Sequence, residues 1–197
     1  MGGIVLVCAV AGAAMVAGFV RGGQLDGVAS ASVRLPALLL GGFALQVLAA
    51  IAGTLGWPSG AVTALQMLAL AALGVFTLLN LRMPGMRLLA AGVLLNLVVL
   101  GLNGGMPVTS GALARAGHPV TVATGRPDAE YVLVDASTVL RPLADVWAVR
   151  PLGQVVSVGD VAQYAGLFLL VQGLMIRSEH ARRPRYEEFD YGVRPVR

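Results

Sequence analysis

Five apolar runs, each close to the length of a membrane-spanning helix, occupy most of this chain. They cover residues 2–20, 35–57, 61–81, 88–102 and 161–176. A helix needs about 20 apolar residues to cross the hydrocarbon core of a bilayer. Only 12% of the residues are charged, whereas soluble domains carry about a quarter. The sequence therefore predicts an all-α integral membrane protein whose fold is a bundle of five transmembrane helices.

The basic residues predict how this bundle is oriented. All 14 of them are arginine, which is typical of a GC-rich bacterial genome, so we expect a multi-pass protein of the bacterial cell (inner) membrane. Cytoplasmic loops of membrane proteins carry an excess of basic residues. Arginines follow the first, third and fifth apolar runs and are absent between the second and third: Arg21, Arg34, Arg82, Arg87, Arg177, Arg182, Arg183, Arg185, Arg194 and Arg197. This pattern predicts an N-terminus outside the cell and a C-terminus in the cytoplasm.

The domain organisation follows from the same runs. We expect residues 1–177 to form the bundle, including one extracytoplasmic loop at 103–159, and residues 178–197 to be a basic cytoplasmic tail without ordered structure. Within the loop, β-branched residues on both sides of a Gly-Arg-Pro-Asp turn (residues 125–128) predict a short β-hairpin. Residues 138–147 predict a short helix capped by Thr138. The lipid bilayer is the expected partner, together with a membrane protein, and no nucleic acid is expected.

Small residues recur at four-residue spacing within three of the runs. The pairs are Ala14 with Gly18, Ala49 with Gly53, and Ala162 with Gly166. Small residues at this spacing let two helices approach closely in a membrane. We interpret them as packing positions of the bundle.

Two polar motifs flank the long loop. The first, NGGMPV, starts at Asn103 where the fourth run ends, and the second, VVSVGD, ends at Asp160 as the fifth run begins. An ionisable side chain inside an apolar stretch is costly and marks a functional site. Residues three or four apart share a helix face, so Asp160 would have polar neighbours in an outward-facing groove. The candidate ligand-binding residues are Asn96, Asn103, Ser157, Gln163 and Tyr164.

Asp160 has two interpretations at this point. Ser157 and Asp160 fit a capping box, in which the aspartate stabilises the N-terminus of the fifth helix. Alternatively, Asp160 is catalytic together with Asp145, or with Asp135. Two carboxylates close together share a proton and activate water. The two interpretations are compatible, since a capped carboxylate is also a positioned one.

Metal and cofactor chemistry have no recognisable motif in the sequence. The single cysteine, Cys8, lies inside the first apolar run, and the histidines are His118 and His180 alone. Nucleotide-binding, serine-hydrolase and zinc-protease fingerprints are all absent from the sequence. We therefore expect no metal and no cofactor.

Two family resemblances rest on these motifs. NGGMPV, the S-x-G-D of Ser157 to Asp160, and a T-x-L-x-x-L-x-D stretch from Thr138 to Asp145 resemble an uncharacterised family of small bacterial membrane proteins, domain of unknown function family 5317. That resemblance covers Met1 to about Arg177 and implies no known activity. A local one links Asp160 to lipoprotein signal peptidase, an intramembrane aspartyl protease with an N-x-A-D motif. Here the asparagine of that motif and the family's N-x-x-D-R motif are missing, and five spans replace four.

Three functions follow as hypotheses. The first is an accessory, scaffold or binding subunit with a polar site at its outer face, consistent with the lack of any complete catalytic signature. The second is an intramembrane aspartyl hydrolase using Asp160 with Asp145 or Asp135. The third is a small transporter component whose intramembrane polar residues line a path: Gln46, Gln66, Asn96 and Gln163.

Overall fold

A computed structural model describes residues 2–118 and 131–182, and five long helices dominate it. They are α1 (Gly2–Val20), α3 (Pro36–Thr54), α4 (Ser59–Leu79), α5 (Met86–Asn103) and α7 (Val158–Arg182). Four have the length and hydropathy of membrane spans, namely α3, α4, α5 and the Val158–Ile176 part of α7. The chain is thus a mostly helical, multi-pass membrane protein. Helix α1 is apolar but shorter over Ile4–Val20, so a fifth crossing stays a prediction.

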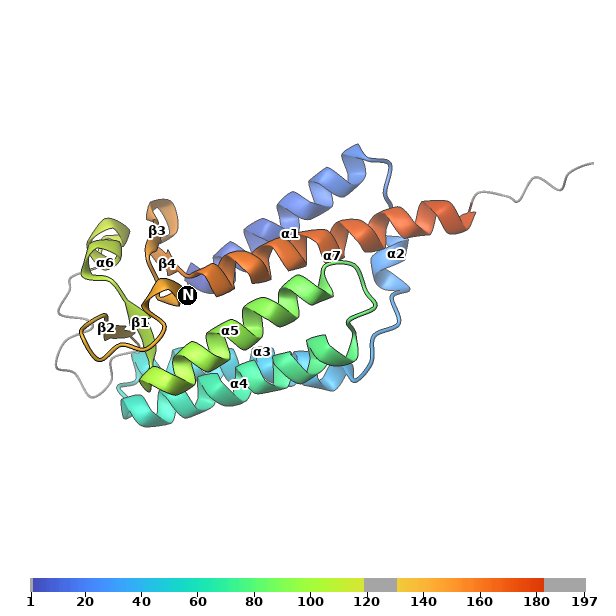
Figure 1. Cartoon of the computed structure of the whole chain (residues 1–197). Coiled ribbons are helices and arrows are strands. Elements are labelled where there is room, and N and C mark those ends of the chain that lie inside the picture. The colour runs from blue at the N-terminus through green and yellow to red at the C-terminus, as the bar shows by residue number, and fades with distance from the viewer. Residues whose placement is uncertain (1, 119–130, 183–197) are drawn as a thin grey trace, which may run out of the picture.

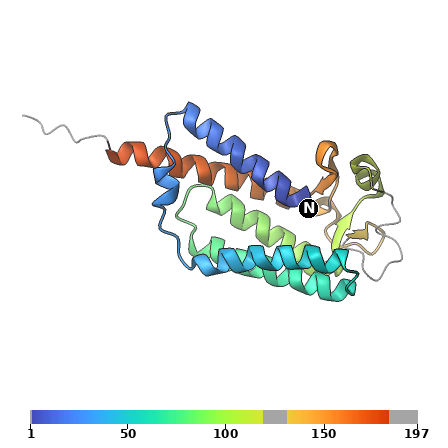
Figure 2. The ribbon, with the colours of Figure 1, turned by 180° about the vertical axis from the view of Figure 1, so that it is seen from behind.

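The long helices pack in a row whose order differs from their order along the chain. Helix α1 packs on α7, α7 on α5, α5 on α4, and α4 on α3, with successive helices of the chain running in opposite directions (Figure 1). The last helix therefore lies between the first helix and the others, as the view from behind also shows (Figure 2). A short helix, α2 (Asp26–Ala29), contacts α7 at one end of the row.

Glycines bring α5 and α7 into backbone contact. A Cβ added at Gly166 would lie 2.5 Å from the backbone nitrogen of Leu89, and one at Gly92 would overlap the carbonyl oxygen of Gly159. Gly159, Gly166 and Gly173 recur every seven residues of α7 and so lie on one face. Close approach through small residues is how helices associate without a hydrophobic driving force in lipid.

The segment between α5 and α7 forms a small subdomain at the other end of the row (Figure 1). Its elements are β1 (Met106–Val108), α6 (Ser110–Ala116), β2 (Tyr131–Leu133), η2 (Arg141–Leu143), β3 (Trp147–Val149), η3 (Arg150–Leu152) and β4 (Gln154–Val156). Strand β1 pairs in parallel with β2, and β3 pairs antiparallel with β4. Val108, Leu113 and Val155 belong to a buried apolar cluster of its own. We call residues 104–157 the outer segment, because they lie at the outer end of the helix row, beyond α5 and α7.

Two predictions about this segment need comparison with the structure. The first arm of the expected hairpin falls in residues 119–130, outside the described residues, while its second arm is β2, which pairs in parallel with β1. The helix expected at 138–147 is wrong: only the three-residue 3₁₀ turn η2 forms there. Thr138 is engaged in a turn with Asp135, and the amide of Asp145 donates to the Pro107 carbonyl at 2.8 Å, extending the β1 pairing.

Two further features of the helices differ from expectation, the presence of α6 and the length of α7. Helix α6 was not predicted, although Thr109 before it and Gly117 after it are signals of a helix start and end. In the structure the Thr109 hydroxyl accepts from the Ala112 amide at 3.3 Å, and Gly117 ends the helix at a φ of 88°. Threonine N-caps and glycine C-caps are standard helix boundaries. Helix α7 continues to Arg182, beyond the domain boundary expected at 177. Residues 183–197 lie outside the described part.

Candidate functional site

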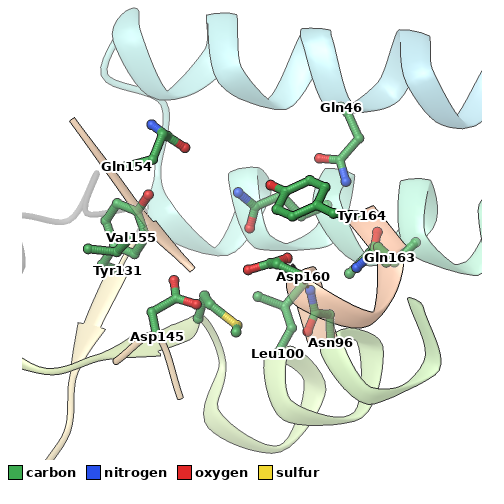
Figure 3. A pocket seen from close by; sticks show the side chains of 13 residues that line it. Gln46, Asn96, Leu100, Tyr131, Asp145, Gln154, Val155, Asp160, Gln163 and Tyr164 are labelled. Atoms are coloured by element: carbon green, nitrogen blue, oxygen red, sulfur yellow. Dashed lines mark hydrogen bonds between the residues drawn. The ribbon is translucent and has the colours of Figure 1, made fainter. Parts of the chain in front are cut away.

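A polar cavity of about 240 Å³ lies where the outer segment meets the helices. Four long helices contribute to its wall, and each supplies at least one polar side chain (Figure 3). These side chains are Gln46 of α3, Gln66 of α4, Asn96 of α5, and Asp160, Gln163 and Tyr164 of α7. The four residues expected to line a transport path (Gln46, Gln66, Asn96 and Gln163) thus gather around one cavity at one end of the row.

Asp160 reaches this cavity from the first turn of α7, where it forms the predicted capping box. Its Oδ2 accepts from the Ser157 amide at 2.9 Å and lies 3.0 Å from the Ser157 hydroxyl, and its own amide donates to that hydroxyl at 3.1 Å. Ser157 is fully buried. The cap therefore fixes the backbone and one carboxylate oxygen of Asp160 together.

Asn96 holds the other carboxylate oxygen. Its Nδ2 donates to Asp160 Oδ1 at 2.7 Å, and its Oδ1 lies 3.1 Å from the Ser157 hydroxyl. A serine hydroxyl has one proton, so it donates to Asn96 or to Asp160 at any moment. Gly159 makes this arrangement possible, because a Cβ there would overlap the Asn96 side chain. The α5–α7 contact thus positions the carboxylate as well as packing the helices.

Asp145 approaches the cavity from the outer segment. Its backbone is fixed by two bonds to the β1 region, in which its amide donates to Pro107 and its carbonyl accepts from the Thr109 amide at 3.1 Å. The residue is 4% exposed. Figure 3 shows the carboxyl groups of Asp145 and Asp160 directed toward the same space. Tyr131 and Gln154 of the outer segment complete the polar wall.

The cavity is acidic. Asp145 and Asp160 are the charged residues of its described lining, and no arginine or histidine belongs to that lining. Within residues 2–118 and 131–182, no group of three or more histidine, cysteine, aspartate or glutamate side chains is placed to hold a metal ion. The other lining groups are amides, tyrosines and apolar side chains.

Three of the predicted site residues do not line the cavity. Ser157 lies behind Asp160 as its cap. Asn103 fastens the outer segment: its Oδ1 accepts from the Val139 amide at 2.9 Å and its Nδ2 donates to the Val139 carbonyl at 3.1 Å. Asp135 is exposed, and its Oδ1 accepts from the hydroxyl and amide of Ser137 at 2.6 and 2.8 Å. Neither Asn103 nor Asp135 lines the cavity.

Several lining residues were not predicted as part of a binding site. Gln46 and Gln66 are isolated amides within apolar runs, a signal that was noted only for a path through the membrane. Tyr131 carries no local signal, because it reaches the cavity through the pairing of β2 with β1, in which it lies opposite Met106. Gln154 begins β4 of the β3–β4 hairpin, opposite Val149, and this hairpin was not predicted from the sequence.

Comparison with known proteins gives a family and no activity. A model described as "Family of unknown function (DUF5317)" matches residues 30–172. Neither the curated proteins nor the solved structures contain a significant match, so the local resemblance of Asp160 to lipoprotein signal peptidase gains no support. The family match includes four long helices, most of α7 among them, and every residue that lines the acidic cavity. The chain therefore belongs to the DUF5317 family.

Proposed function

We propose that the protein is a membrane-embedded accessory or binding subunit that holds a small, positively charged ligand in the acidic cavity. One observation carries the proposal: two carboxyl groups, Asp145 and Asp160, face a cavity whose described lining has no basic side chain. A cation bound between the two carboxylates would be attracted by both, and this attraction is stronger in a partly buried site of low dielectric constant than in water.

The cavity's size and walls suggest the kind of cation. A volume of about 240 Å³ lies between a ~150 Å³ cavity that admits benzene and the ~300 Å³ at which drug-sized sites begin. Tyr131 and Tyr164 offer aromatic rings, which attract organic cations. The amides of Gln46, Gln66 and Gln163 offer donors and acceptors for a polar group. A small amine with a short apolar part fits this combination better than a bare metal ion.

The binding geometry is also prepared before a ligand arrives. Ser157 and Asn96 hold both oxygens of the Asp160 carboxylate. The Asp145 backbone is fixed by its pairing with the β1 region. Groups that are already ordered lose little conformational freedom on binding, which favours affinity.

Three compounds of similar shape and different charge test the proposal: isobutylamine, isobutanol and isobutyrate. Each is added to the full chain in phosphatidylcholine nanodiscs, and the shift in Tm is measured, since a ligand that binds the folded state raises Tm. We expect a rise with the amine alone. Asp160→Asn and Asp145→Asn should abolish it. Asp135→Asn, which removes a carboxylate outside the cavity, should retain it. Equal shifts for the three compounds, or an unchanged amine shift in Asp160→Asn, would contradict the proposal.

A second candidate function is an intramembrane aspartyl hydrolase. Because Asp145 and Asp160 line the same cavity, Asp145 is favoured over the exposed Asp135 as the second catalytic carboxylate. In such an enzyme one carboxylate takes a proton from water while the other protonates the leaving group. Mass spectrometry of membranes from a deletion strain, complemented with each variant, tests this function. An uncleaved protein or lipid that accumulates with both Asp145→Asn and Asp160→Asn, and not with Asp135→Asn, is the expected result. Normal processing by either cavity variant would rule the hydrolase out.

A further inference from the structure

A second hollow lies at the opposite end of the helix row. It has a volume of about 330 Å³ and is formed by the turn between α4 and α5 together with Leu169 of α7. Two arginines line it, Arg82 in the turn and Arg87 in the first turn of α5. Leu81 and Leu88 are among the apolar residues beside them. It shares no lining residue with the acidic cavity.

The hollow has a fixed shape because the turn is pressed against α7. Gly85 has a φ of 74°, a conformation that favours glycine, and a Cβ on it would overlap the carbonyl oxygen of Gly166. Pro84 packs on Gly173, where an added Cβ would lie 2.5 Å from the proline Cβ. These two contacts leave the turn little room to move relative to α7.

The arginines are available to a ligand. Within the described residues, the structure gives neither the Arg82 nor the Arg87 guanidinium a hydrogen bond or an ion pair, and no acidic residue lines the hollow. A guanidinium presents five N–H donors in a planar fork that matches the oxygens of a phosphate. Two of them around one hollow form a site for a phosphate-bearing anion.

The apolar side of the hollow indicates where that phosphate comes from. Leu81, Leu88 and Leu169 are 37%, 41% and 45% exposed, and they lie on or beside helices that have the length of membrane spans. Headgroup phosphates lie at the ends of such helices, and basic pockets between helices bind anionic headgroups there. A free phosphate would satisfy the arginines and leave the leucines uncovered.

We propose that this hollow binds one anionic phospholipid, with its phosphate on Arg82 and Arg87 and an acyl chain along Leu88 and Leu169. The site needs only that the helices are embedded in a bilayer. It does not depend on which side of the membrane the arginines face, or on what the acidic cavity binds.

Native mass spectrometry of the full chain tests the proposal. The protein is taken from phosphatidylcholine nanodiscs doped with phosphatidylglycerol, and the bound lipids are counted. We expect one retained phosphatidylglycerol. Arg82→Gln and Arg87→Gln should each weaken its binding about fivefold, the effect of one basic residue near an anionic lipid surface. Arg34→Gln is the matched control, because it removes the same charge at the same end of the helix row and does not line the hollow.

Further arms separate a built site from general attraction and from a phosphate site. Leu169→Asn should also weaken retention, since it removes the apolar contact and leaves both arginines, and circular dichroism checks that each variant is folded. Millimolar inorganic phosphate should leave the lipid in place. Equal weakening by Arg34→Gln, equal retention of phosphatidylcholine, or displacement by inorganic phosphate would each overturn the proposal.

Discussion

Asp160 combines two tasks in one carboxylate. Its Oδ2 belongs to the cap with Ser157, whereas its Oδ1 faces Asn96 and the cavity. The capping interpretation made from the sequence is therefore confirmed, and it does not replace the functional one. Substitutions at residue 160 can separate the cap from the charge because an amide retains the first and removes the second.

The first prediction concerns Asp160→Asn and Asp160→Ala. The asparagine keeps an acceptor for the Ser157 amide, so its free energy of unfolding should stay near that of the wild type, while amine binding is lost. The alanine removes the cap and should cost on the order of 1 kcal/mol. Ser157→Ala is the control: it should cost a similar amount and still bind the amine, because the backbone amide of residue 157 still donates to Asp160 Oδ2 and Asn96 still donates to Oδ1. Unfolding in mixed micelles gives the stabilities. Equal rescue of a knockout phenotype by both Asp160 variants would exclude a functional role for the residue.

The second prediction concerns Asp135, which lies outside the cavity. The hydroxyl and the amide of Ser137, each donating to the carboxylate, hold the pKa of Asp135 below its ordinary 3.8. Because the folded-state pKa is the lower one, this contribution to stability is present above pH 3.8 and is lost as the pH falls through the folded-state pKa. In an NMR titration, Ser137→Ala should raise the midpoint of Asp135 toward 3.8. An unchanged midpoint would show that Ser137 does not hold the carboxylate.

At the level of elements, glycines allow α7 to contact α5 and the turn before it at backbone distance. The seven-residue series Gly159, Gly166 and Gly173 lies in the contact between α7 and α5 or the turn before α5. Of the small-residue pair Ala162 and Gly166 expected from the sequence, Gly166 belongs to this glycine series and Ala162 does not. Gly53 lies in no close helix contact, since a Cβ added there would meet no atom within 4 Å.

The third prediction compares alanine at these two kinds of glycine. Gly166→Ala forces a methyl against the backbone of Leu89 and Gly85 and should destabilise the protein by about 1–3 kcal/mol, the usual cost of overpacking. Gly53→Ala has open space and should be neutral or slightly stabilising. The free energy of unfolding in mixed micelles measures both. Equal effects of the two substitutions would mean that the α5–α7 contact is looser than the structure shows.

The elements also show what a sequence can predict for such a chain. The long helices lie within a few residues of the predicted ranges, apart from the extended C-terminus of α7, because apolar length is a local property. The capping box is local as well. The pairing of Met106 with Tyr131 and the approach of Asp145 to the cavity depend on contacts between distant residues, which a local pattern does not encode. The sequence analysis thus named the polar lining residues of α5 and α7, together with Asp145, as candidate site residues. It assigned Gln46 and Gln66 to a path through the membrane, and it did not name Tyr131 or Gln154.

At the level of the whole molecule, the two ends of the helix row differ in charge. The acidic cavity lies at the end of the row next to the outer segment, whose described arginines are Arg115, Arg141 and Arg150. At the other end, Arg21 and Arg34 lie between α1 and α3, Arg82 lies in the turn before α5, and Arg87 lies in the first turn of α5. These four arginines are among those from which the positive-inside rule predicts the orientation, and in that prediction the cavity faces outward.

The fourth prediction is that orientation. Alkaline phosphatase fused after Trp57 and after Gly125 should be active, because it would lie outside the cytoplasm. Green fluorescent protein fused after Arg185 should fluoresce, because it would lie inside. Fusions of the other reporter at each position serve as controls. A cytoplasmic readout at Gly125 would place the outer segment and the acidic cavity on the inner side of the membrane and would refute the topology.

The position of α7 between α1 and α5 has a consequence for biogenesis. Among the long helices, α1 packs on α7: Arg21 donates to Gln172 at 2.7 Å, and Gly18 and Gly23 press on Met175. A ribosome completes α1 first and α7 last, at about 5–20 residues per second. The first helix must therefore remain in the bilayer without this packing partner until α7 has been made. A nascent chain that stalls before α7 would leave that helix unattached and open to membrane proteases.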